Sequence, residues 1–145
     1  MPNTNRTKVS TILWTAQVLL ALLFLFAGTM KFVLPIAVMA GPLGFSGAFL
    51  HFIGTAEILG ALGLVLPGAL RIRTGLTPLA ASGLVIIMIG ATVLTTMVMG
   101  LVSALLPFLV GVIAAAVCYG RWRVAPLTEA RGSRALQAVE SLGTP

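Results

Sequence analysis

Charge is scarce in this chain, and this scarcity excludes a soluble protein. Only 8% of the 145 residues are charged, whereas 59% are hydrophobic. A soluble domain carries about 25% charged residues, so this chain could not cover itself with a polar surface. We therefore expect an all-α integral membrane protein whose main partner is the lipid bilayer.

Residue types that build metal and catalytic sites are equally few. The chain has one histidine, one cysteine and three acidic residues. One histidine and one cysteine cannot build an ordinary zinc or haem site, so neither metal nor haem is expected. The lone Cys118 cannot carry out dithiol exchange. The sequence also shows no nucleophile–base pair and no phosphate-binding loop, which argues against a stand-alone enzyme.

Long stretches without charge mark the membrane spans. A hydrocarbon core of about 30 Å needs about 20 apolar residues in a helix. The stretches predict four spanning helices, with a turn at Gly100, at residues 9–31, 48–66, 78–99 and 101–120. Thr77 and Pro78 have the residue types of an N-cap and a first helical position. The apolar connection 32–47, broken by Pro and Gly, is expected to lie as a short helix in the membrane interface.

The basic residues predict the orientation. Four spans place residues 1–8, the connection around Arg71 and Arg73, and the tail 121–145 on one side, which then holds eight of the nine Lys and Arg residues. The positive-inside rule makes this side the cytoplasm, so both termini are expected there. The high pI of about 11.3 follows from these flanks. No soluble unit presents a basic face, so nucleic acid is not an expected partner.

Glu57 is the most informative residue, because it must lie inside the bilayer. The apolar run that follows it, residues 58–70, is too short to cross, and the run before it is broken by Pro and Gly. A complete second span must therefore contain Glu57. An acidic residue at a helix centre costs about 2.5–3.5 kcal/mol on insertion scales, so it needs a partner, a proton or a function.

Three interpretations of Glu57 remain open at this stage. It pairs with Lys31 at the outer end of the first span, or it stays neutral and hydrogen-bonds Thr55, Gln17 or Thr92, or it carries a proton or binds a ligand. If the first span ends near residue 33 and the second starts near residue 48, Glu57 lies roughly 10 Å deeper than Lys31. Direct pairing then requires an inward reach of the lysine, a tilt or a bridging water.

His51 lies near the outer start of the second span, six positions before Glu57 and on another face of the helix. The simplest interpretation is an interfacial histidine. A proton relay toward Glu57 and a hydrogen bond to a quinone carbonyl are the alternatives.

Each predicted span carries one stripe of small or polar residues at helical spacing, which predicts a closed four-helix bundle. These stripes are Gln17, Ala21, Phe24, Gly28 and Lys31; Gly54, Glu57, Ala61 and Leu64; Ser82, Val85, Ile89, Thr92 and Thr96; and Ser103, Pro107, Gly111, Ala114 or Ala115, and Cys118.

Two motifs resemble the DoxX-like family of small bacterial four-helix membrane proteins. They are Phe24-Leu-Phe-Ala-Gly-Thr-Met-Lys31 and Glu57-Ile-Leu-Gly-Ala, and the resemblance covers roughly residues 10–120. Many relatives carry a histidine shortly after the position of Gly90-Ala91, where this chain has Thr92. The resemblance implies a bacterial cytoplasmic (inner) membrane protein. The family's namesake is the membrane subunit of a thiosulfate:quinone oxidoreductase, and other relatives accompany membrane redox complexes.

Three hypotheses about function follow. The first is a redox-associated membrane subunit that holds a quinone or anchors a soluble oxidoreductase, with Glu57, Lys31 and Gln17 forming a polar pocket. The second is a small, dimeric proton-coupled transporter in which Glu57 carries the proton. The third is a non-catalytic assembly protein. The sequence favours the first and third over the second, since Lys31 offsets the charge of Glu57.

Overall fold

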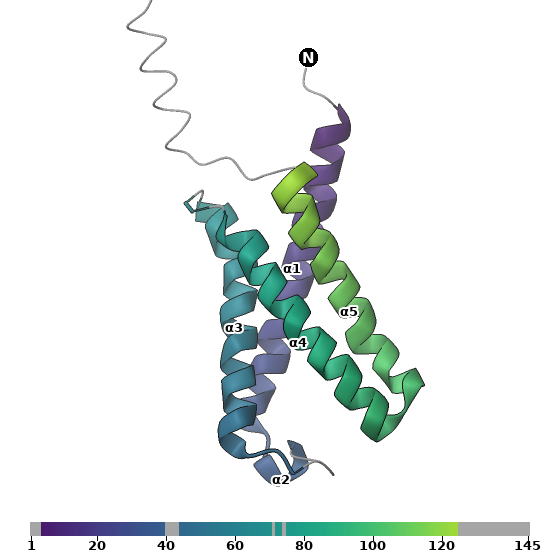
Figure 1. Cartoon of the computed structure of the whole chain (residues 1–145). Helices are drawn as coiled ribbons and strands as arrows, with labels where there is room; N and C mark the ends of the chain where they lie inside the picture. Colours follow the sequence, from purple (N-terminus) through teal and green to yellow (C-terminus); the bar gives the residue numbers. More distant parts are fainter. Residues whose placement is uncertain (1–3, 40–43, 71, 74, 125–145) are drawn as a thin grey trace, which may run out of the picture.

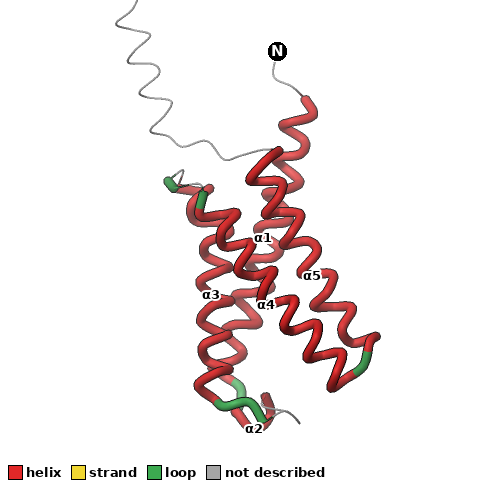
Figure 2. Tube along the Cα trace, in the orientation of Figure 1, coloured by secondary structure: helices red, strands yellow, loops and turns green. Residues whose placement is uncertain are grey.

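The computed structural model describes residues 4–39, 44–70, 72–73 and 75–124 (Figure 1). Every regular element in these ranges is helical: α1 (Thr4–Val33), α2 (Ile36–Met39), α3 (Gly47–Leu70), α4 (Leu76–Met99), α5 (Leu101–Tyr119) and a π-helical turn, η2 (Gly120–Val124). Four helices are long and apolar enough to cross a membrane. The predicted all-α fold with four spans is therefore confirmed (Figure 2).

The helix ends differ from the predicted ones where a proline or a glycine takes part. Pro67 was expected to end the second span, but α3 continues through it to Leu70. Pro67 lies within the last turn of α3, so the backbone hydrogen bond that it cannot donate is one of the last in the helix. The predicted cap at Thr77 is wrong, since Gly75 stands at the N-cap and the Thr77 side chain is buried. Gly100 forms the expected turn with a φ of 85°, which favours glycine.

The chain also differs from the prediction beside the membrane. Residues 121–124, expected to begin the tail, continue the last span as η2, while residues 1–3 and 125–145 lie outside the described ranges. Within the connection 32–47 the structure places the short helix α2, as expected; residues 40–43 of this connection are not described.

The helices form two antiparallel pairs. Helix α1 packs along α3, α4 packs along α5, and α3 joins the pairs through α4 (Figure 1). Helices α1 and α5 meet at the end where η2 lies, and the two pairs diverge toward the opposite end, where α2 and the α4–α5 turn lie. The predicted four-helix bundle is therefore confirmed, but it is open at this end and not closed as expected. In lipid, exposed apolar side chains carry no hydrophobic penalty, so nothing forces the pairs together.

The predicted stripes of α1 and α3 are confirmed by burial. Gln17, Phe24, Glu57, Ala61 and Leu64 are each at most 3% exposed. The first two lie on α1 and the others on α3, so this interface holds much of the core.

The predicted stripe of α4 is wrong, because its buried residues are Thr77, Ala81, Leu84 and Met88. Shape decides the face here. A Cβ on Gly60 of α3 would lie 2.6 Å from a methyl carbon of Leu84, so Leu84 occupies the space that this glycine leaves. On α5, Ala114 is buried as expected, together with Ala104 and Val117.

Candidate functional site

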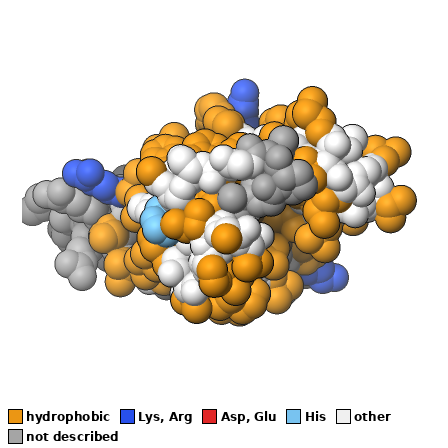
Figure 3. Space-filling model, turned by 90° about the horizontal axis from the view of Figure 1, so that it is seen from below, with side chains coloured by type: hydrophobic (Ala, Val, Ile, Leu, Met, Phe, Trp, Pro, Cys, Tyr) orange, Lys and Arg blue, Asp and Glu red, His pale blue; other side chains and the backbone are white. Residues whose placement is uncertain are grey.

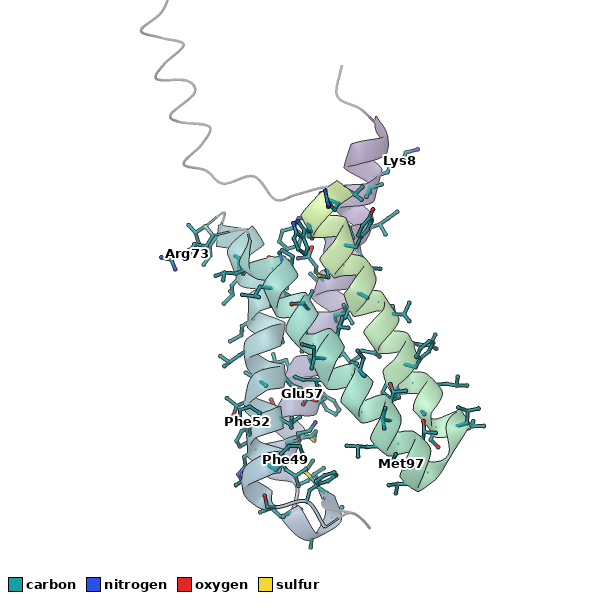
Figure 4. The ribbon with its side chains drawn as sticks, in the orientation of Figure 1. Lys8, Phe49, Phe52, Glu57, Arg73 and Met97 are labelled. Carbon is teal, nitrogen blue, oxygen red and sulfur yellow. The ribbon has the colours of Figure 1, made fainter. Side chains whose placement is uncertain are left out.

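An ion pair joins α1 to α3 near the end where α2 lies (Figure 4). The Nζ atom of Lys31 donates a hydrogen bond to Oε2 of Glu57 over 2.7 Å. The lysine side chain is 18% exposed and the glutamate side chain only 4%. Figure 3 views the molecule from this end: among the described residues, the visible face is mostly hydrophobic and shows no acidic side chain. The structure thus realises the ion-pair interpretation of Glu57.

Two glycines allow the helices to come close enough for this pair. A Cβ on Gly28 would lie 2.8 Å from the backbone oxygen of Gly54, and a Cβ on Gly54 would lie 3.0 Å from the backbone oxygen of Gly28. Any larger residue would push α1 and α3 apart. The short polar reach from Lys31 to Glu57 therefore depends on a backbone contact of the small-residue type found between membrane helices.

The predicted depth difference between the two charges is too large, and the offset of the helices explains why. The Cβ of Lys31 lies 3.0 Å from the position of a Cβ on Gly54, so Lys31 is level with Gly54. It is therefore only three residues of α3 nearer the α2 end than Glu57. Three helical residues rise about 4.5 Å, which the lysine stem spans. The prediction assumed that α1 ends level with the start of α3, whereas α3 begins beyond the end of α1 (Figure 1).

His51 lies next to Phe32, the neighbour of Lys31. Among the described residues, no hydrogen bond joins its ring to the Glu57 carboxylate. The His51 ring stacks on that of Phe32, with 4.9 Å between ring centroids and 9° between planes. The ring is half-buried, and the backbone oxygen of His51 accepts a hydrogen bond from Thr55 Oγ1. The stacked rings of Phe32 and His51 therefore lie beside Lys31. Thr55 bonds this backbone oxygen and not Glu57, contrary to one of the open alternatives.

Gln17 belongs to a different polar site, which corrects the pocket expected from the sequence. Its Nε2 donates to the backbone oxygen of Leu64 over 2.6 Å, and its Oε1 accepts from Nε of Arg121 over 2.6 Å. Gln17 and Lys31 are 14 positions apart in α1, about 21 Å along the helix. Gln17 therefore cannot join Glu57 and Lys31 in one pocket.

Arg121 is the residue that sequence reasoning missed. It was expected to be a basic flank of the last span at the membrane surface, but it is only 3% exposed. Its guanidinium also donates to Ser10 Oγ over 3.3 Å and lies 5.4 Å from the centre of the Trp14 ring. Ser10, Trp14 and Gln17 share one face of α1, which is a signal the sequence contains. The π-helical turn that directs Arg121 toward this face is not readable from spacing.

Thr92 is also separate from Glu57. Its hydroxyl donates to the backbone oxygen of Met88 in the same helix over 2.7 Å. It lines an apolar hollow of about 330 Å³ between α4 and α5, with Met88, Pro107 and Gly111 among its neighbours. The alternative in which Thr92 bonds Glu57 is therefore not realised.

An apolar layer separates the two polar sites. The buried side chains between the levels of Gln17 and Lys31 include Leu20, Phe24, Ala61 and Leu64. In the part of the chain that the structure describes, the buried polar side chains are Gln17, Glu57, Thr77 and Arg121, and none of them lies between Gln17 and Glu57 on α1 or α3. Among the described residues there is also no group of three His, Cys, Asp or Glu side chains that would hold a metal ion.

Comparison with protein families gives one result. The sequence model of the DoxX-like family matches residues 15–117, a range that contains Lys31, Glu57 and most of all four spans. No curated protein and no solved structure matches the chain.

Proposed function

Because this chain belongs to the DoxX-like family, we propose that it is a redox-associated membrane subunit that holds a quinone head group and anchors a soluble oxidoreductase. The observation that supports this most is the Lys31–Glu57 pair, a partly exposed cation held by a buried carboxylate. Intramembrane ionisable residues generally mark sites of function. In this proposal the protein lies in the bacterial cytoplasmic membrane with both termini in the cytoplasm.

The residues around Lys31 fit a quinone carbonyl. An ammonium group has three N–H donors, and Glu57 Oε2 accepts one of them over 2.7 Å. The lysine side chain is 18% exposed, so part of it can contact a ligand that enters from the bilayer. Phe32 follows Lys31 in α1, and its ring stacks on that of His51 from α3. The flat face of such a stack can pack against the ring of a ligand.

The chain's own part in such chemistry is to bind, orient and hold protons. Lys31 Nζ would donate a hydrogen bond to a carbonyl oxygen, and Glu57 would fix the lysine head group through the hydrogen bond already present. A bound quinone would accept two electrons from the partner oxidoreductase and two protons. The 18% exposure of the Lys31 side chain supports proton exchange with the membrane surface at the α2 end, because the buried side chains between the pair and Gln17 are apolar.

The test compares quinone-dependent electron transfer in membranes that contain the wild-type protein, Glu57→Gln or Lys31→Gln. We expect both variants to raise the quinone concentration needed for half-maximal rate, while affinity-purified wild-type protein brings an oxidoreductase with it. Thr92→Val is the matched control, since Thr92 lines a different hollow and bonds only its own helix. Unchanged quinone dependence in both charge variants would refute the proposal.

A purely structural role is the second candidate, and a specific observation favours it. The pair lies beside the Gly28–Gly54 crossing, where it fastens α1 to α3. In this case Glu57→Gln changes thermal stability and nothing else. The proton-coupled transporter receives less support, since Glu57 already has a cationic partner and an apolar layer lies beneath it; pH-dependent ligand binding lost in Glu57→Gln would restore it.

A further inference from the structure

An open groove of about 600 Å³ runs between α1 and α5. Residues from Thr11 to Leu23 of α1 line one side, and Val110 and Ile113 of α5 line the other. The groove shares no lining residue with the Lys31–Glu57 pair or with the Gln17–Arg121 site. None of the functions considered above uses it.

The groove arises because α1 and α5 touch closely at one end only. A Cβ on Gly120, the first residue of η2, would lie 2.6 Å from a methyl carbon of Leu13, so the last span is in contact with α1 where α5 passes into η2. From this contact α5 leans away from α1 toward the α4–α5 turn (Figure 1). Ile12 and Leu19, which line the groove, are 67% and 63% exposed, so no described part of the chain covers it.

The length of the groove indicates what fills it. Thr11 and Leu23 are 12 positions apart, which is about 18 Å along a helix. One leaflet accounts for about 15 Å of a hydrocarbon core about 30 Å thick. The groove therefore matches a chain confined to one leaflet and is too short for a helix of a second copy, which would cross the whole core.

The charge at the end of the groove indicates the head group. Lys8 precedes Thr11 and Ile12 by three and four positions, so it lies on the same face of α1, one turn beyond the groove. It is exposed at the end of the molecule where α1 passes η2 (Figure 4). A lysine at the membrane surface attracts anionic lipid head groups.

We propose that this groove binds one acyl chain of an anionic phospholipid, whose phosphate lies at Lys8. The chain packs along α1 between Thr11 and Leu23, and the head group lies at the membrane surface beside η2. The lipid lies in the leaflet at the end of the molecule where α1 begins and η2 ends, whichever side of the membrane that is. It does not depend on the proposed redox function.

Native mass spectrometry of the purified full chain in detergent tests the proposal. The probes are dioleoylphosphatidylglycerol and dioleoylphosphatidylcholine, which share their acyl chains and differ in charge. We expect one phosphatidylglycerol per chain, bound more tightly than phosphatidylcholine. Lys8→Gln should weaken phosphatidylglycerol about fivefold, as expected from about 1 kcal/mol for one surface cation. It should weaken phosphatidylcholine less, because the choline of that lipid offsets the charge of its phosphate.

Arg73→Gln is the matched control, because Arg73 is exposed at the same end of the molecule but on its opposite side (Figure 4). It should leave both lipids unchanged. Ala16→Phe fills the groove and should weaken both lipids; since Ala16 also packs against the core, Thr15→Phe repeats the test from an exposed position.

Three outcomes overturn the proposal. Equal effects of Lys8→Gln and Arg73→Gln would indicate diffuse attraction by surface charge. Unchanged binding in both groove-filling variants would place the lipid elsewhere. Cross-linking of Thr15→Cys between copies in native membranes would make the groove an interface between two chains.

Discussion

Replacing Lys31 with methionine keeps most of the side-chain volume and removes the cation that faces Glu57. The carboxylate, 4% exposed, would then be buried without its partner. Breaking a buried ion pair from one side typically costs about 3–5 kcal/mol. The carboxyl group can limit this loss by taking up a proton. At pH 7, protonating a carboxyl with an ordinary pKa of about 4.3 costs about 3.7 kcal/mol, at 1.36 kcal/mol per pH unit.

The same reasoning predicts an asymmetry between the partners. Glu57→Gln leaves a lysine that is 18% exposed, and its flexible stem can carry the ammonium toward the membrane surface. We expect a loss of about 1–2 kcal/mol in this variant. The double variant Lys31→Met with Glu57→Gln should therefore be more stable at pH 7 than Lys31→Met alone, although it carries one more substitution.

The assay is reversible unfolding in mixed detergent micelles, followed by the helical signal in circular dichroism, at pH 7 and pH 5. In Lys31→Met the folded state binds one proton more than the unfolded state above pH 4.3, so its stability falls as the pH rises. The limit on the loss is about 1 kcal/mol at pH 5 and about 3.7 kcal/mol at pH 7. Equal losses in the two single variants at pH 7, or a loss in Lys31→Met that does not change with pH, would refute the reasoning.

Three further predictions test the α1–α3 contact, the Gln17–Arg121 site and the orientation in the membrane. Gly28→Ala should cost about 1–3 kcal/mol, because the added Cβ meets the backbone of α3 at 2.8 Å; Gly90→Ala, which meets no atom within 4 Å, should be neutral or stabilising by up to about 1 kcal/mol in the same unfolding assay. Gln17→Leu removes two buried hydrogen bonds and should cost about 1–3 kcal/mol, and a melting temperature equal to that of the wild type would contradict the described network. In a background without Cys118, a membrane-impermeant maleimide added to intact cells should label Val102→Cys and not Arg73→Cys; the reverse pattern would overturn the predicted orientation.

Part of the candidate site was predictable because it depends on local features. Glu57 stands within the only stretch that completes a second span. Lys31, at the connection between the first and second spans, is the only basic residue on its side of the four predicted spans. The Gly28 and Gly54 positions fall on the same stripes as these charges, so their helical faces could be read from spacing. The match of depth could not, because the spacing within one helix says nothing about its offset from the next.

The Gln17–Arg121 site shows a different limit. Gln17 was recognised as a polar residue on a buried stripe, but its partner lies 104 positions away in a π-helical turn. The sequence predicts a position at the membrane surface for Arg121, because basic residues that flank a span commonly lie there. Only the approach of η2 to α1 turns it into a buried hydrogen-bond donor.

The amino-acid sequence by itself determined that this is a four-span helical membrane protein, that Glu57 lies within the bilayer, and which faces of α1 and α3 meet. These results follow from the amount of charge and from the positions of charge and glycine along single helices. The tertiary structure alone decided the face of α4, the divergence of the two helix pairs and the groove between α1 and α5. In lipid both the buried and the exposed faces of a helix are largely apolar, so side-chain shape, such as Leu84 against Gly60, selects the contacts. Shape complementarity exists only between helices already brought together.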